Sequence, residues 1–89
     1  MANDPSVDVR QFILKQFPLA RKKQINDSDP LLESGIIDSL GVLELVGFID
    51  QKFSVTVQDE DLVPDNFQTI ERVAAFIKRQ IDHNGSLHP

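Results

Sequence analysis

The sequence predicts a small all-α fold, a four-helix bundle of three longer helices and one short one. Its 89 residues are fewer than one average domain needs, so we expect a single domain, residues 1–89, with an ordered core over about 4–83 and a tail at 84–89. Apolar residues recur at helical spacing in three stretches. Strictly alternating strand pairs are missing from the sequence, which argues against a sheet.

The first helix should begin after Asp4-Pro5, an N-cap residue followed by proline at the first helical position. Apolar side chains at one helical spacing then predict its buried stripe: Val9, Phe12, Ile13 and Phe17. Pro18 should end this helix. Residues 18–38 show turn chemistry and no sustained period, which predicts a long loop. Four apolar side chains should hold that loop on the core: Leu31, Leu32, Ile36 and Ile37.

The second helix is expected near Asp38-Ser39 and extends to about Phe53. Residues 54–57 predict an extended connector or a lone strand. Residues 59–63 predict a single helical turn that ends around Pro64. Thr69 should cap the last helix, and Asn84-Gly85 should stop it. The inward stripe of that helix is predicted to be Ile70, Val73, Ala74, Ile77 and Ile81.

The charge is unevenly distributed along the chain. The net charge is −5, but residues 26–66 alone contain ten acidic side chains and one basic. Such a surface repels phosphate backbones, so we expect no nucleic-acid partner; basic partner surfaces would be attracted, and the acidity also favours solubility. The triplet Arg21-Lys22-Lys23 is interpreted as a solvated turn or, alternatively, as a secondary docking patch.

Several site classes find little support. The chain contains no cysteine, no membrane-spanning apolar run and no signal peptide, so we expect a cytoplasmic monomer. Neither Asp27-x-Asp29 nor Asp59-x-Asp61 has the glycine that a calcium loop requires, so no metal site is predicted. Ser39 lacks the glycine of a nucleophile elbow, and the histidines, at 83 and 88, lie in or beside the tail; we predict no catalytic residue.

On a helical wheel of residues 39–53, the core face contains Val42, Leu45, Val46, Ile49 and Phe53. Leu40 and Leu43 fall on the other side with Ser39, Glu44 and Gly47. Either these leucines cover the long loop or they form a partner-docking patch. Gly41 and Gly47 would let another surface approach closely. Ser39 itself lies at a helix start, either as a plain N-cap or as a place where a phosphate is tolerated.

The segment 32–40, LESGIIDSL, followed by Glu44-Leu45 and Phe53, resembles the phosphopantetheine attachment region of acyl carrier proteins. The resemblance spans residues 31–81 and includes the Phe67-x-Thr69-Ile70 start of the last helix. Fatty-acid carriers usually have an acidic residue and a methionine where this chain has Gly41 and Gly47, so it looks closer to aminoacyl or D-alanyl carriers.

The resemblance implies that Ser39 carries 4′-phosphopantetheine, transferred from coenzyme A by a phosphopantetheinyl transferase. An acyl or aminoacyl group would be held on it as a thioester, loaded by an adenylating ligase and passed to downstream transferases. The implied docking residues are Asp38, Leu40, Leu43, Glu44, Gly47 and Asp50. A short cargo is favoured. The alternative is an unmodified helical adaptor that binds one partner through the exposed face of helix 39–53.

Overall fold

The computed structural model of the chain describes residues 4–87, and side chains over residues 4–82. Its helices are α1 (Pro5–Gln16), α2 (Pro18–Lys23), α3 (Ser39–Phe53), the 3₁₀ turn η1 (Asp59–Asp61), α4 (Pro64–Phe67) and α5 (Ile70–Leu87). Within that part of the chain no strand forms, so the expected all-α bundle is confirmed. Residues 54–57 connect α3 to η1 without regular structure, and Ser54 is left-handed, so the expected extended connector is wrong at that residue. None of the described helices is long and apolar enough to cross a membrane.

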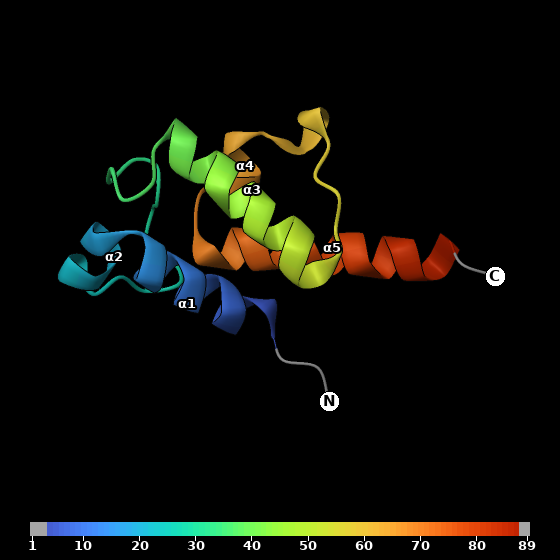
Figure 1. The fold of residues 1–89 in the computed structure, drawn as a ribbon, viewed down its shortest axis with the longest axis horizontal. Helices are drawn as coiled ribbons and strands as arrows, with labels where there is room; N and C mark the ends of the chain where they lie inside the picture. Colours follow the sequence, from blue (N-terminus) through green and yellow to red (C-terminus); the bar gives the residue numbers. More distant parts are fainter. Residues whose placement is uncertain (1–3, 88–89) are drawn as a thin grey trace.

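Helices α1, α3 and α5 enclose one apolar core (Figure 1). The largest side chains in it that are fully buried are Phe76, Ile13, Ile25, Leu31, Ile37, Leu45, Ile49, Ile70 and Ile77. Of the predicted stripe of α1, Val9 and Ile13 are buried, whereas Phe12 and Phe17 are half-buried. Because the loop residues Leu31, Ile36 and Ile37 are buried and Leu32 is half-buried, the loop before α3 is fastened to the core as expected.

The predicted caps of the first and last helices are confirmed. The Asp4 carboxylate accepts a hydrogen bond from the Ser6 N–H at 2.9 Å, which lowers the pKa of that carboxyl, with a smaller contribution from Lys78. At α5, the Thr69 hydroxyl oxygen accepts from the Arg72 N–H at 3.0 Å. Both side chains satisfy donors that the helix cannot bond internally.

Two prolines that were predicted only to end a helix or a helical turn are each the first residue of another helix. Pro18 ends α1 as expected, but it is also the first residue of α2, so residues 18–23 are helical instead of loop. Pro64 likewise begins α4, and the preceding turn spans Asp59–Asp61, shorter than the predicted 59–63. The physical reason is the same at both places, since proline fixes a helical φ and lacks only the N–H that a first helical residue leaves unbonded.

The end of α5 also differs from the prediction. The helix continues through Asn84-Gly85 to Leu87, so the predicted stop is wrong; residues 88–89 of the predicted tail lie outside the described residues. Glycine weakens a helix but does not forbid helical dihedral angles. Ile81, predicted to face inward, is 42% exposed because the last turns of α5 extend past α3 (Figure 1).

The two glycines of α3 have opposite surroundings. A Cβ added at Gly41 would lie 2.8 Å from both the Phe17 ring and the Ile37 side chain, so the surface that approaches Gly41 is the chain's own α1–α2 junction. A Cβ added at Gly47 would meet nothing within 4 Å. Only Gly47 therefore matches the prediction of a position open to another molecule.

We expect the two alanine substitutions to change stability in opposite directions. Gly47→Ala should raise the free energy of unfolding by up to about 1 kcal/mol, because alanine is the better helix former and has room. Gly41→Ala should lower it by about 1–3 kcal/mol, because the new methyl group overpacks against Phe17 and Ile37. Chemical denaturation of both variants measures this, and equal changes in the two would contradict the packing described for Gly41.

Candidate functional site

The start of α3 is organised by Asp38, which is its N-cap residue. The Asp38 carboxylate accepts from the Gly41 N–H at 2.8 Å, and the Asp38 carbonyl accepts from the Val42 N–H at 2.9 Å. Two of the first backbone N–H groups of α3, those of Gly41 and Val42, are therefore hydrogen-bonded to Asp38. Within residues 4–82, the N–H groups of Ser39 and Leu40 have no acceptor, so the N-terminal end of the helix keeps free donors.

Ser39 is the first residue of α3, and its side chain is exposed. The plain N-cap role considered for this serine is excluded, because Asp38 fills it. Among the described side chains, none forms a hydrogen bond with the Ser39 hydroxyl. A hydroxyl so placed is accessible to another protein and sits where the helix dipole favours an added negative charge.

The preceding loop turns sharply just before this serine. Gly35 has a φ of +77°, in the left-handed region that side chains other than glycine rarely adopt. The buried side chains of Ile36 and Ile37 follow, and the Ile37 N–H donates to the Leu31 carbonyl at 3.1 Å. The turn and these two anchors fix the direction from which the chain reaches Asp38, and so the position of Ser39.

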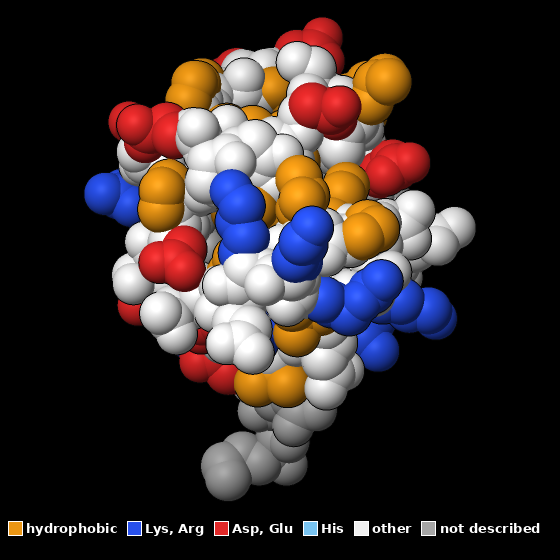
Figure 2. Space-filling view, turned by 90° about the vertical axis from the view of Figure 1, so that its left-hand side faces the viewer, with side chains coloured by type: hydrophobic (Ala, Val, Ile, Leu, Met, Phe, Trp, Pro, Cys, Tyr) orange, Lys and Arg blue, Asp and Glu red, His pale blue; other side chains and the backbone are white. Residues whose placement is uncertain are grey.

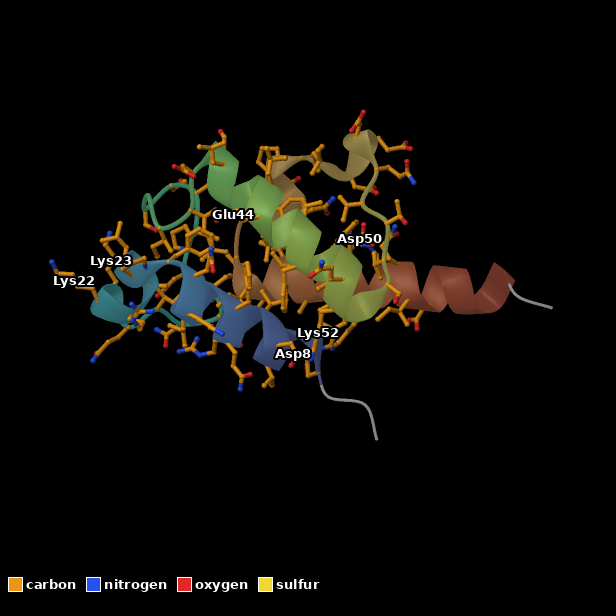
Figure 3. The ribbon with its side chains drawn as sticks, in the orientation of Figure 1. Asp8, Lys22, Lys23, Glu44, Asp50 and Lys52 are labelled. Atoms are coloured by element: carbon orange, nitrogen blue, oxygen red, sulfur yellow. The ribbon has the colours of Figure 1, made fainter. Side chains whose placement is uncertain are left out.

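The exposed face of α3 is the one predicted for docking. Leu40 and Leu43 are 72% and 58% exposed, so they do not cover the loop, which excludes the structural role considered for them. Glu44 and Asp50 point outward from the same helix (Figure 3), and Gly47 is exposed between them. The opposite face is buried as predicted at Leu45 and Ile49, with Val42, Val46 and Phe53 half-buried against the core.

A groove of about 440 Å³ lies beside Ser39. One wall is the first turns of α3, with Asp38, Leu40, Gly41 and Glu44; the other is the α1–α2 junction, which the sequence analysis did not assign to the site. The residues of that second wall are Gln16, Phe17, Pro18 and Leu19, with Gly35 and Ile36 closing one end. The only signal for them in the sequence was an apolar run interrupted by a proline.

A basic cluster lies at the same end of the molecule (Figure 2), where α2 contains Arg21, Lys22 and Lys23. The interpretation as a turn is wrong, because these residues are helical. Arg21 donates to the carbonyls of Leu14 and Lys15 at the end of α1, and Lys23 donates to the Ser34 carbonyl at 3.2 Å. Lys22 extends outward (Figure 3). A docking role for the cluster stays a prediction.

The described part of the chain contains no cluster of side chains suited to binding a metal ion. There, no three histidine or acidic side chains come together closely enough to hold a cation. The chemistry that the site offers is therefore that of one accessible hydroxyl beside a groove and free helix donors.

Comparisons with known proteins place this chain in a family. The family model described as a phosphopantetheine attachment site matches residues 8–77. A probable acyl carrier protein, PigG of Serratia sp. strain ATCC 39006, is 31% identical over 71 residues, which are 80% of this chain and 82% of the relative. A chain from a structure titled "Crystal structure of FAD-dependent dehydrogenase" aligns with a TM-score of 0.59 at 34% identity, covering 63% of this chain and 79% of that one.

The family match includes most of α1, all of α3 and the first part of α5, residues 70–77, so it extends over the helical core and not only over the serine segment. Both the expected family and the expected cofactor are confirmed. This chain belongs to the acyl carrier proteins, the small helical proteins whose covalent prosthetic group is 4′-phosphopantetheine.

Proposed function

We propose that Ser39 carries the phosphopantetheine and that the chain presents an acyl or aminoacyl thioester on it to partner enzymes. The observation that carries this proposal is the exposed hydroxyl at the first residue of α3, capped by its neighbour Asp38. A phosphodiester there would find the free N–H groups of Ser39 and Leu40 and solvent on its outer side. The residues present therefore fit the group.

The prosthetic group supplies what the polypeptide lacks. The chain has no cysteine, so the thiol at the end of the arm is the group that can form a thioester. The residues of the chain bind and orient: Asp38 holds the helix start, and the turn at Gly35 sets the serine at the surface. Bond-making is assigned to separate enzymes, in keeping with a carrier and not a catalyst.

Ser39→Ala should abolish modification completely. Incubation with a phosphopantetheinyl transferase and coenzyme A should add the mass of one phosphopantetheine to the wild-type chain and none to the variant, measured by intact-protein mass spectrometry. Ser34→Ala is the matched control, because Ser34 lies in the preceding loop five residues before Ser39 and outside the helix, and it should be modified like wild type. The unmodified-adaptor alternative predicts no added mass on any of the three, which would overturn the carrier proposal.

The transferase and a loading ligase are proposed to dock on the exposed face of α3. Leu40 and Leu43 offer apolar area, and Asp38, Glu44 and Asp50 offer charges for basic partner surfaces. Gly47 keeps the middle of this face flat. Because these charges are exposed, each pair contributes only about 0–1 kcal/mol. Binding should accordingly weaken as salt concentration rises, which suits a carrier that must release each partner.

Leu43→Gln should lower kcat/KM for phosphopantetheinylation about fivefold to tenfold, by removing apolar area that the partner covers. Since Leu43 is mostly exposed, thermal stability should stay close to wild type. Leu62→Gln is the control on a different part of the surface, where the leucine is 39% exposed. Equal loss in both variants, or no loss in Leu43→Gln, would contradict docking at this face.

A second observation favours a particular class of downstream partner. The aligned part is 63% of this chain and 79% of the chain from the dehydrogenase structure, so that chain is about 70 residues long. A chain of that length forms one small core and leaves little room for a flavin-binding domain. That chain is therefore about as long as a carrier domain, although the structure that contains it is titled for an FAD-dependent dehydrogenase. We infer that this chain presents its thioester to a flavin-dependent dehydrogenase, which oxidises the cargo while it is attached.

If the cargo is oxidised while attached to the carrier, the mass of the loaded protein should fall. With the dehydrogenase and its FAD, a loaded wild-type chain should lose two hydrogens, or a multiple of two, from the cargo, as read by mass spectrometry of the intact thioester. The free cargo acid should not be oxidised. Oxidation of the free acid at an equal rate would show that the carrier is dispensable for that step.

A further inference from the structure

A continuous seam leads away from Ser39 between α1 and α3. The groove beside the serine and a second hollow of about 340 Å³ share Gln16 and Glu44. The second hollow and a third of about 330 Å³ share Phe12 and Phe48. Since each hollow shares residues with the next, together they follow the length of the α1–α3 contact, toward the end where Asp8 and Lys52 lie (Figure 3).

Gly47 keeps the middle of this seam open. It lines the second hollow, and a Cβ added there would meet nothing within 4 Å. The other residues of this hollow include Phe12 and Phe48, whose rings are stacked at 4.3 Å between centroids with an interplanar angle of 15°. Both rings are half-buried, so they offer an apolar surface that is partly accessible.

The seam matches a phosphopantetheine arm in length and in chemistry. From Ser39 to Gly47 the helix rises about 12 Å, and the extended arm from phosphate to sulfur measures about 15–20 Å at ordinary bond lengths and angles. The arm has a branched apolar end near the phosphate and two amides farther along. In the seam, Phe17, Pro18 and Leu19 come first, and the hydrogen-bonding side chains of Gln16, Glu44 and Gln51 follow.

The described side chains beneath α3 belong to the buried core. Leu45 and Ile49 are fully buried there and pack in the same cluster as Ile77 of α5. A cargo that entered the core would have to displace these side chains, whereas the seam is already open to solvent.

We propose that the phosphopantetheine arm on Ser39 folds back along the α1–α3 seam and rests its thiol end, with a small acyl or aminoacyl cargo, against Phe12 and Phe48 beside Gly47. This inference rests on the proposed attachment at Ser39. It assigns α1 and the α1–α2 junction a role in holding the cargo, and it requires a partner to draw the arm out of the seam before reaction.

The chain's lack of cysteine makes the arm directly observable. On the phosphopantetheinylated protein, a thiol-specific nitroxide attaches only to the arm. We expect the nitroxide to broaden the backbone amide NMR signals of residues 12–16 and 44–51 much more than those of 59–67, with the reduced label as reference. Amide shifts between the unmodified and the unlabelled modified protein should concentrate on the same residues, which tests the arm without the label.

Two variants sharpen the test. Gly47→Gln places a longer side chain in the seam, at a position where an added Cβ meets nothing within 4 Å, so the broadening at Phe12, Gln16 and Phe48 should fall several-fold while the protein stays folded. Arg72→Gln is the control: it introduces the same side chain at an exposed position of α5 that lines none of the three hollows and is not a proposed docking residue, and it should leave the broadening unchanged.

Equal broadening of 12–16 and 59–67, or broadening that Gly47→Gln does not reduce, would overturn the seam as the resting place. Mass spectrometry before labelling separates this outcome from failure of the proposed function. A protein that gains no phosphopantetheine refutes attachment at Ser39, whereas a fully modified protein with the wrong broadening pattern refutes only the seam.

Discussion

The N-cap of α3 is the interaction on which the site depends. By accepting from the Gly41 N–H, the Asp38 carboxylate fixes where the helix begins, and Ser39 becomes its first residue. If the helix began one residue later, the serine itself would be the cap and its hydroxyl would accept from the backbone. Because the neighbour performs that task, the serine oxygen is available for a covalent group.

The cap in turn depends on how the preceding loop is held. Leu31, Ile36 and Ile37 are buried, and the turn at Gly35 directs the chain from the loop into α3. Within the same first turn of the helix, the absence of a side chain at Gly41 lets Phe17 and Ile37 pack against the helix backbone. The site therefore depends on the core, because buried core residues fix the position of Ser39 while leaving its side chain at the surface.

The same helix serves two surfaces with different requirements. Toward the core it presents Leu45 and Ile49, whose burial stabilises the bundle. Toward solvent it presents leucines and carboxylates at spacings that no internal contact explains, and a glycine that leaves a hollow open. An outward face without internal contacts fits the partner docking proposed for it.

Much of this could be predicted from local pattern alone. The apolar period identified the core faces of α1, α3 and α5 apart from Ile81, and the capping chemistry located Asp4 and Thr69, because both depend on residues close together in the chain. The exposure of Leu40 and Leu43 followed from the helical wheel. The segment around Ser39 indicated the family because its residues are contiguous.

Tertiary structure decided what depends on distant contacts. That Phe17 occupies the space over Gly41 while Gly47 stays open follows from how α1 and α2 pack on α3, which no local spacing specifies. The two prolines that begin α2 and α4 have the same local signal as prolines that merely end a helix. The groove and the seam are formed by residues about 20–45 positions apart in the chain, and only packing brings them together.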